Sequence, residues 1–144
     1  MDLSERNQQL IERNKQLIEA FRASPNKADG TYEGRALLLL TTTGAKSGQP
    51  RTSPVAYIRD GERLVVIGSN QGLHTHSAWY YNLRAHPQVT VEVGDEKFAA
   101  TAAEASGEER QRLWQKFVAA MPGFADYQAN TTRQLPVIVL TRQG

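Results

Sequence analysis

Cysteine is absent from this sequence of 144 residues. Its absence excludes disulfide bonds, thiolate metal ligands and a cysteine nucleophile, and it favours a reducing compartment. Long hydrophobic runs are also missing: no apolar stretch approaches the ~20 residues that cross a bilayer, and the N-terminus lacks the continuous apolar segment of a signal peptide. We therefore expect a cytoplasmic protein that does not associate with membranes.

An excess of charge of one sign is missing as well. Lysine and arginine number 17 and aspartate and glutamate 15, which leaves a net charge of +2. A surface that follows nucleic-acid phosphates needs a larger and more clustered positive charge, so we expect no nucleic-acid partner. An anionic small molecule would instead need a local binding site.

The composition is otherwise that of an ordinary folded domain. The hydrophobic fraction is 40% and the charged fraction 22%, and a chain of this length buries roughly 68–70% of the surface that it exposes when unfolded. No internal repeat or low-complexity tract marks a second unit. We expect one domain over residues 1–144, in which residues 1–30 form an N-terminal helix and a linker.

The N-terminal segment is predicted to be a helix over residues 2–22. Its apolar residues form a stripe with heptad-like spacing, made of Leu3, Leu10, Ile11, Leu17, Ile18 and Phe21. Such a stripe suits packing against the helix's own domain, the seam of a homodimer or a membrane surface. Charges of both signs along the helix argue against a membrane surface. We favour packing on its own domain, and the stripe is compatible with a monomer or a homodimer.

Apolar alternation and turn residues predict six strands. They cover residues 36–43, 52–59, 63–69, 88–93, 97–103 and 135–141. Asp60-Gly61 is the dipeptide that a type I′ hairpin turn prefers, and Gly94-Asp95 marks a second hairpin. The first three strands are therefore expected to be antiparallel neighbours.

Three further helices are predicted between and after these strands. One covers residues 77–85, and another covers residues 125–130. A third follows Ser106 and Glu109, which have capping-box spacing, and its apolar face is formed by Leu113, Trp114, Phe117, Val118 and Met121. The pattern favours a mainly β (α+β) fold, a small barrel with peripheral helices.

The most informative stretch, residues 41–51, reads TTTGAKSGQPR and joins the first two predicted strands. Its glycines allow backbone N–H groups to approach an anion, while Lys46 and Arg51 supply charge and donors that suit a phosphate. The spacing differs from that of a P-loop. The residues alone leave two interpretations open: an anion-binding cradle, or a solvated hairpin loop.

Several motifs of this chain occur together, at matching separations, in one known family. They are the TTTGAKSGQPR loop, the RDG hairpin at residues 59–61 and the WYxNLxxxPxVxV pattern within residues 79–93. Over residues 36–139 the chain thus resembles the deazaflavin-dependent nitroreductase family. The resemblance implies a split β-barrel, similar to that of FMN-binding proteins. It also implies coenzyme F-420, an 8-hydroxy-5-deazaflavin with a phosphate and a glutamate tail.

By the same resemblance, four segments would hold the cofactor. The implied cofactor-binding residues are Ala45, Lys46, Ser47, Gly48, Arg51, Thr52, Ser53, Pro54, Ile67, Gly68, Ser69, Asn70, Ala78, Trp79, Tyr80, Tyr81 and Asn82. Where the best-known nitroreductase of the family has an arginine and a second lysine, this chain has Ala45 and Asn70. We therefore expect fewer contacts to the anionic tail of the cofactor, and weaker binding of that tail.

The substrate-binding wall is implied at Ala56, Met121, Phe124 and Tyr127, where the family is richer in tyrosine, so the pocket should be more apolar and wider. Hydride chemistry resides in the cofactor, and the protein contributes orientation, exclusion of water and a proton. Ser69 and Tyr127 are our candidate catalytic proton donors, with solvent as the alternative. Ser69 could equally cap its loop, and Tyr127 could serve only in packing.

The implied function is that of an F-420-dependent reductase. It would transfer hydride to electron-poor small molecules such as enones, quinones, coumarin-like lactones or nitroaromatics. Two alternatives stay open: an oxidoreductase of the same fold that binds FMN, and a non-catalytic carrier or sensor.

His74 and His76 have a spacing at which two imidazoles could touch one metal ion. Cysteine is absent, and Glu62 is the only acidic residue within residues 61–81. A third ligand is therefore missing, and we expect no metal site.

Overall fold

The computed structural model describes residues 3–24, 31–32, 35–72 and 75–143. In chain order its elements are α1 (Leu3–Ala23), β1 (Thr31–Tyr32), β2 (Arg35–Thr43), β3 (Pro50–Ala56), β4 (Ile58–Asp60), β5 (Arg63–Ile67), η1 (Asn70–Gly72), α2 (Ala78–Ala85), β6 (Gln88–Val93), β7 (Glu96–Glu104), α3 (Gly107–Ala120), α4 (Gly123–Ala129) and β8 (Val137–Arg142). None of the helices in the described ranges is long and apolar enough to cross a membrane.

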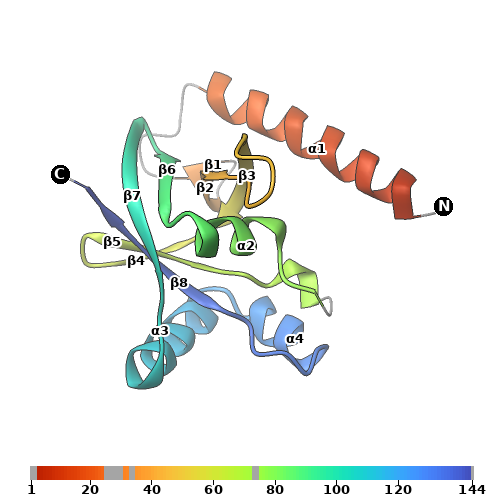
Figure 1. The fold of residues 1–144 in the computed structure, drawn as a ribbon. Coiled ribbons are helices and arrows are strands. Elements are labelled where there is room, and N and C mark those ends of the chain that lie inside the picture. Colours follow the sequence, from red (N-terminus) through yellow and green to blue (C-terminus); the bar gives the residue numbers. More distant parts are fainter. Residues whose placement is uncertain (1–2, 25–30, 33–34, 73–74, 144) are drawn as a thin grey trace.

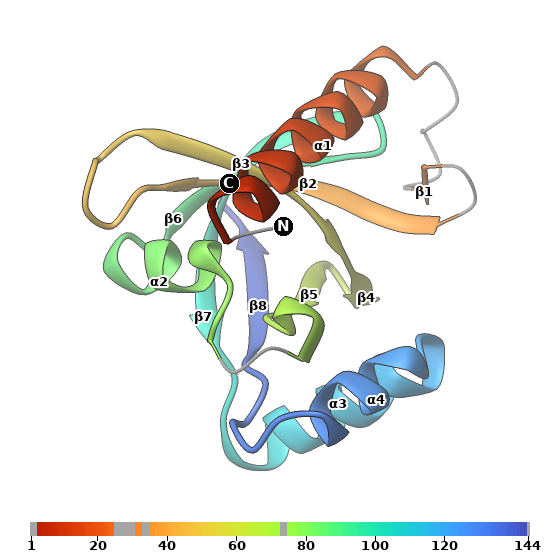
Figure 2. The same ribbon diagram turned by 90° about the vertical axis from the view of Figure 1, so that its right-hand side faces the viewer.

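The strands form one curled, antiparallel sheet, which confirms the expected mainly β, split-barrel architecture (Figure 1). The strand order is β1-β2-β6-β7-β8-β5-β4, and β3 also pairs with β2. In Figure 2, α1 lies over β2 and β3, while α3 and α4 lie at the opposite end of the sheet. Short antiparallel connections account for most neighbours, because hairpins join consecutive strands directly.

The predicted strand 52–59 is interrupted at Tyr57, which the sequence pattern did not indicate. β3 pairs with β2, whereas β4 pairs with β5. Tyr57 is 3% exposed at this break, with the Cζ atom of Arg59 5.6 Å from its ring centroid. Within the described residues the sheet therefore has eight strands rather than six, since the break adds one and the two-residue β1, which follows the predicted linker, adds another.

The hairpin turn between β4 and β5 differs from the predicted type. Asp60 pairs with Arg63, so the two loop residues are Gly61 and Glu62, and Gly61 has a φ of 62°. A positive φ at the first loop residue alone is the pattern of a type II′ turn, in which glycine takes that position. Gly94, with a φ of 58°, takes the same place in the hairpin between β6 and β7.

The start of α3 also departs from the prediction. Ser106 is the N-cap residue, but its side chain makes no capping hydrogen bond, so the capping box does not form. Glu109 lies instead near the hairpin, with its Oε2 atom 3.6 Å from Arg63 Nη1. The predicted apolar face is confirmed, because Leu113 and Phe117 are fully buried. Burial of this face, rather than capping, holds the helix in place.

At β5 the sheet is covered on both faces. Alternate side chains of a strand point to opposite faces, so Leu64 and Val66 enter a core cluster with β2, β6, β8 and α2. Val65 and Ile67 enter a second cluster, with α3 and the start of β8. The helices α2 and α3 thus pack on different sides of the curled sheet.

The N-terminal helix α1 packs on the barrel through its C-terminal half. Phe21 is 1% exposed and contacts buried Leu39 of β2, with Leu17 and Ile18 half-buried beside them. Ile11, in the other half of the helix, is 67% exposed. The N-terminal end projects past the sheet in Figure 1. Packing on its own domain is therefore confirmed for the C-terminal half of α1.

Candidate functional site

The predicted cradle between β2 and β3 is a closed turn. The Gly44 N–H donates to the Gln49 carbonyl at 2.8 Å, and the Gly48 N–H donates to the Gly44 carbonyl at 2.9 Å. A Cβ atom on Gly44 would lie 2.4 Å from Ser47 Oγ, and Gly48 has a φ of 70°. Both positions therefore favour glycine. The turn leaves the side chain of Lys46 exposed.

Asn82 of α2 fastens this loop to the helix. Its Oδ1 atom accepts a hydrogen bond from the Ala45 N–H at 3.0 Å, and its Nδ2 atom donates to Thr42 Oγ1 at 3.1 Å. The residue is 8% exposed. Asn82, which the resemblance assigns to cofactor binding, therefore holds the loop in place in this structure.

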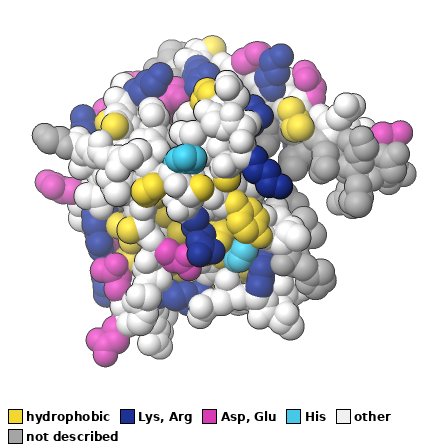
Figure 3. Space-filling view, in the orientation of Figure 1, with side chains coloured by type: hydrophobic (Ala, Val, Ile, Leu, Met, Phe, Trp, Pro, Cys, Tyr) yellow, Lys and Arg dark blue, Asp and Glu magenta, His cyan; other side chains and the backbone are white. Residues whose placement is uncertain are grey.

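An open pocket lies between the loop and α2. It has a volume of about 620 Å³ and is lined by Ala45, Lys46, Tyr81, Arg84 and Ala85. Tyr81 is 48% exposed, so an exposed aromatic ring shares the pocket with two cations. Hydrophobic side chains gather near the middle of this face, with lysine and arginine side chains around them (Figure 3). A flat ligand that carries negative charge suits this set of groups.

The predicted residues of β3 lie directly after the loop. Arg51 is exposed, and within the described part of the chain no carboxylate lies within ion-pairing distance of it. Thr52, Ser53 and Pro54 are half-buried. The Thr52 hydroxyl lies 2.8 Å from that of Thr41 on β2, which joins the two strands beside the loop.

The turn after β5 brings another predicted segment to α2. A Cβ atom on Gly68 would lie 2.9 Å from the Pro136 ring and 3.6 Å from the Trp79 ring, so there is no room for a side chain. Ser69 and Asn70 are half-buried. Asn70 has a φ of 44°, the one positive value at a non-glycine residue within the described ranges. The turn is therefore closely packed and locally strained.

Several residues assigned to the cofactor have side chains in the core. Ile67, Trp79 and Tyr80 are 2%, 8% and 4% exposed. Ala78 and Tyr81 are exposed on α2. The aromatic residues of α2 thus divide by helical position, two facing the core and one facing the pocket.

Two residues at this site, Arg133 and His76, were not among those assigned from the sequence. The Arg133 guanidinium contacts the turn after β5 and also His76 Nδ1, at 3.1 Å. Burial, followed by the charge of Arg133, lowers the pKa of His76. Arg133 lies far along the chain, and no sequence signal connects it to the turn. His74 is outside the described residues, and among those described no cluster of three potential metal ligands occurs.

The predicted substrate wall forms a cluster on α4 and the end of α3. The Phe124 ring makes edge contacts with Phe117, at a centroid distance of 4.8 Å, and with Tyr127, at 5.3 Å. Met121, Phe124 and Tyr127 are half-buried against the second core cluster. α4 contacts η1, and the predicted wall therefore lies beside the turn after β5. Ala56 belongs to β3 and is half-buried there.

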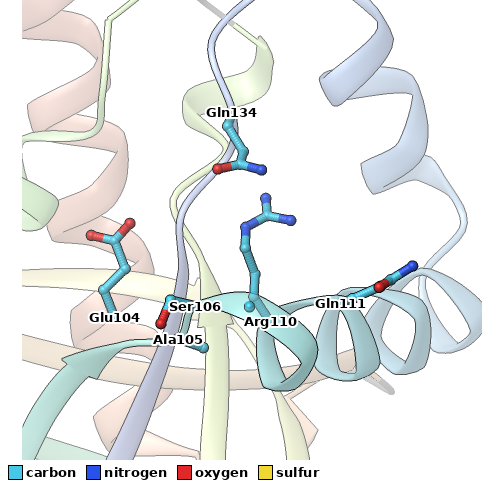
Figure 4. Close-up of a pocket in the computed structure, with 7 residues that line it drawn as sticks. Glu104, Ala105, Ser106, Arg110, Gln111 and Gln134 are labelled. Carbon is cyan, nitrogen blue, oxygen red and sulfur yellow. The ribbon is translucent and has the colours of Figure 1, made fainter.

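A second, polar pocket lies at the start of α3, outside every predicted site (Figure 4). It has a volume of about 430 Å³ and is lined by Glu104, Ala105, Ser106, Gly107, Arg110, Gln111 and Gln134. Its main polar groups already have partners: Arg110 Nη2 donates to the Leu135 carbonyl at 2.7 Å, and Glu104 accepts from the Tyr80 hydroxyl at 2.6 Å.

This chain is similar in sequence to one known family and to proteins that bear the same description. The family described as F-420H(2)-dependent quinone reductase matches residues 13–142. An F-420H(2)-dependent quinone reductase of Mycobacterium tuberculosis is 40% identical over 109 residues, covering 74% of this chain and 73% of the relative. A putative F-420H(2)-dependent quinone reductase of the same organism is 36% identical, covering 72% and 87%.

Solved structures resemble the chain over similar lengths. The structure of an F-420-H2 dependent reductase, FDR-A, has a TM-score of 0.67 and 39% identity, covering 72% of this chain and 92% of that one. A chain described as a domain-swapped dimer has a TM-score of 0.70 and 33% identity, covering 93% and 98%. The heme storage protein HutZ of Vibrio cholerae has a TM-score of 0.60 and covers 91% of both chains, but its 17% identity shows the shared fold alone.

Proposed function

This chain belongs to the F-420H(2)-dependent quinone reductase family, and we propose that it transfers a hydride from reduced coenzyme F-420 to electron-poor organic molecules. As a member of that family it is an F-420-dependent reductase. The names of its relatives support quinones as substrates. We extend the proposal to enones, coumarin-like lactones and nitroaromatics, because an apolar wall discriminates weakly between flat molecules.

One observation carries the proposal at the level of the site. Lys46 and Arg84 share an open pocket with the exposed ring of Tyr81, and exposed Arg51 lies at the other end of the loop. The cofactor combines a planar ring system with anionic groups, so both features have matching groups here. We assign its phosphate to the loop and its flat portion to the side of α2 and the turn after β5.

The chain's own residues would orient both molecules and manage water and protons. Asn82 positions the loop, and the half-buried aromatic cluster of Phe124 and Tyr127 offers an apolar surface for the substrate. We propose Tyr127 or Ser69 as the donor that protonates the reduced substrate, with the proton leaving from the hydroxyl oxygen.

Binding of the cofactor is the primary test. Purified protein is titrated separately with oxidised coenzyme F-420 and with FMN, and ligand fluorescence is followed. We expect saturable binding of the deazaflavin alone. Binding of FMN alone would support the alternative flavin enzyme, and binding of neither would contradict the proposal.

Turnover separates an enzyme from a carrier. We expect loss of reduced coenzyme F-420 to accelerate when a benzoquinone or a cyclic enone is added with the protein. Binding without any acceleration over the protein-free reaction would favour a non-catalytic carrier or sensor.

The proton donor can be tested with the enone. Tyr127→Phe removes the hydroxyl but keeps the ring against Phe124, so we expect kcat to fall about 100-fold if Tyr127 is the donor, with cofactor binding unchanged. Ser69→Ala is the matched test of the other candidate. An unchanged kcat in both variants would assign the proton to solvent.

We also propose a homodimer, because a structural relative with 33% identity is described as a domain-swapped dimer. The exposed side chain of Ile11 on α1 supports an interface there. Sedimentation velocity at several protein concentrations tests this assembly, and a single monomeric species throughout would contradict it.

A further inference from the structure

The side chain of Arg133 joins three parts of the chain that are distant in sequence. It lies in the connection between α4 and β8. Its Nη2 atom donates to the Ser69 carbonyl at 2.6 Å and its Nη1 atom to the Gly68 carbonyl at 3.2 Å. The same Nη1 atom lies 3.1 Å from Nδ1 of His76, just before α2. One guanidinium thus contacts both the turn after β5 and the segment that leads into α2.

The contact between Arg133 and His76 requires one protonation state of the His76 imidazole. A guanidinium has donors only, so Nδ1 of His76 must accept, and the imidazole proton must reside on Nε2. An imidazolium would turn a second N–H toward Arg133 and would add charge repulsion. The His76 ring also packs on Tyr80, with ring centroids 4.4 Å apart, and meets the edge of Tyr81 at 5.6 Å. The contact with Arg133 therefore persists only while His76 is neutral.

We propose that Arg133 and His76 are positioning residues of the cofactor site, which hold the Ser69-Asn70 turn against α2, and that protonation of His76 releases this turn. The inference rests on the proposed function, because it assigns Ser69 and Asn70 to the cofactor. Neither Arg133 nor His76 needs to touch the cofactor. They act through the backbone carbonyls of the turn and through the aromatic rings of α2.

The groups around His76 set the pH range of the effect. Arg133 faces it from the connection before β8, Glu104 from β7, and Arg84, Tyr80 and Tyr81 from α2. Burial and then the two arginine charges lower the pKa of His76, and Glu104 opposes them in part. The folded protein therefore keeps His76 neutral at pH 7. Cofactor affinity should be complete there and should decline only below the ordinary histidine pKa of about 6.5.

Three variants test the proposal, with the dissociation constant for oxidised coenzyme F-420 measured by fluorescence at about pH 5.5 and about pH 7.5. His76→Asn keeps an acceptor that does not titrate, so it should bind like wild type at about pH 7.5 and should keep at about pH 5.5 the affinity that wild type loses. His76→Phe keeps an aromatic ring but removes the acceptor. Arg133→Lys replaces the planar fork of Nη1 and Nη2 with one ammonium nitrogen, which cannot occupy both positions. Each of these should weaken binding about tenfold at neutral pH, as expected for loss of a charge-assisted hydrogen bond.

Comparison of wild type with His76→Asn at the same pH cancels any titration of the ligand. Arg142→Lys is the matched control, since Arg142 pairs with Glu96 on the surface, and it should bind like wild type. Wild-type affinity in Arg133→Lys, or a loss of affinity in acid that is equal in wild type and His76→Asn, would overturn the proposal. If wild type itself binds no coenzyme F-420, the proposed function fails first and this inference fails with it.

Discussion

A single side chain, Asn82, connects the proposed phosphate loop to the helix that carries the exposed Tyr81. Its two polar atoms are both engaged, with the Ala45 N–H and with Thr42 Oγ1. Buried polar groups of this kind are costly to leave without partners. The loop geometry should therefore depend on Asn82 more than on any charged residue nearby.

Asn82→Ala tests that dependence. We expect a loss of about 1–3 kcal/mol in the free energy of unfolding, since the Thr42 hydroxyl and the Ala45 N–H lose a buried partner. Urea denaturation measures the loss. Asn82→Asp keeps the acceptor for Ala45 and should lose less. Equal stability of wild type and Asn82→Ala would show that the contact contributes nothing.

Charge in the loop should act on the ligand and not on the fold. Lys46→Ala and Arg51→Ala should each weaken binding of coenzyme F-420 about tenfold, because a charge-assisted contact to the phosphate is lost. The thermal midpoint should not change, since both side chains are exposed. Lys97→Ala, an exposed lysine of β7, serves as the control. Unchanged affinity in both loop variants would disprove the phosphate assignment.

Between elements, one carboxylate ties α3 to the hairpin of β4 and β5. Asp60 accepts hydrogen bonds from Arg63, Arg112 and Lys116, two of which lie on α3. These hydrogen bonds hold the pKa of Asp60 far below its usual range. The wall formed by α3 and α4 therefore has an electrostatic attachment to the sheet as well as a hydrophobic one.

Asp60→Asn should lower the thermal midpoint by a few degrees at pH 7. The native state depresses the pKa of Asp60, so the unfolded state binds more protons as the pH falls below about 4. The stabilisation is present above that pH and is lost in more acidic solution. The difference between wild type and Asp60→Asn should therefore shrink in acid. A difference that stays constant between neutral and acidic pH would contradict this account.

The packing of α1 on the sheet is the second contact between elements, and its contribution to stability can be measured. Phe21→Ala should lower the free energy of unfolding by about 3 kcal/mol, because Phe21 fills a buried position on Leu39. Ile11→Ala, at an exposed position of the same helix, should change the free energy of unfolding by less than about 0.5 kcal/mol. Similar losses in the two variants would show that α1 does not pack as described.

At the scale of the whole molecule, Ile11 matters for assembly rather than for stability. An exposed apolar residue on a helix contributes little to a monomer but can contribute to an interface between copies. If the proposed homodimer uses this half of α1, Ile11→Asp should shift the sedimentation coefficient toward that of a monomer. Phe21→Leu, which keeps an apolar side chain in the buried half, is the control. No shift in Ile11→Asp would place the interface elsewhere.

Much of the architecture could be predicted from local sequence. The ranges of α1, α2, β2, β6 and β7 follow from periodicity and turn residues, and a glycine occupies each tight hairpin. The break at Tyr57 could not be predicted, because the strand pattern continues through it and the two halves differ only in their partners. The absence of a capping hydrogen bond from Ser106 could not be predicted either, because the Ser106–Glu109 spacing permits that bond without requiring it.

The sequence by itself determined the mainly β fold, through its side-chain periodicity, and the family, through its linked motifs. The cofactor class followed from that family resemblance. Only the tertiary structure decided which assigned residues face the pocket and which lie in the core, as with Tyr81 and Tyr80. It alone joined Arg133 and His76 to the turn after β5. The reason is physical: a long-range contact depends on where the curled sheet places each segment. The separation of two residues along the chain does not determine their distance in the folded protein.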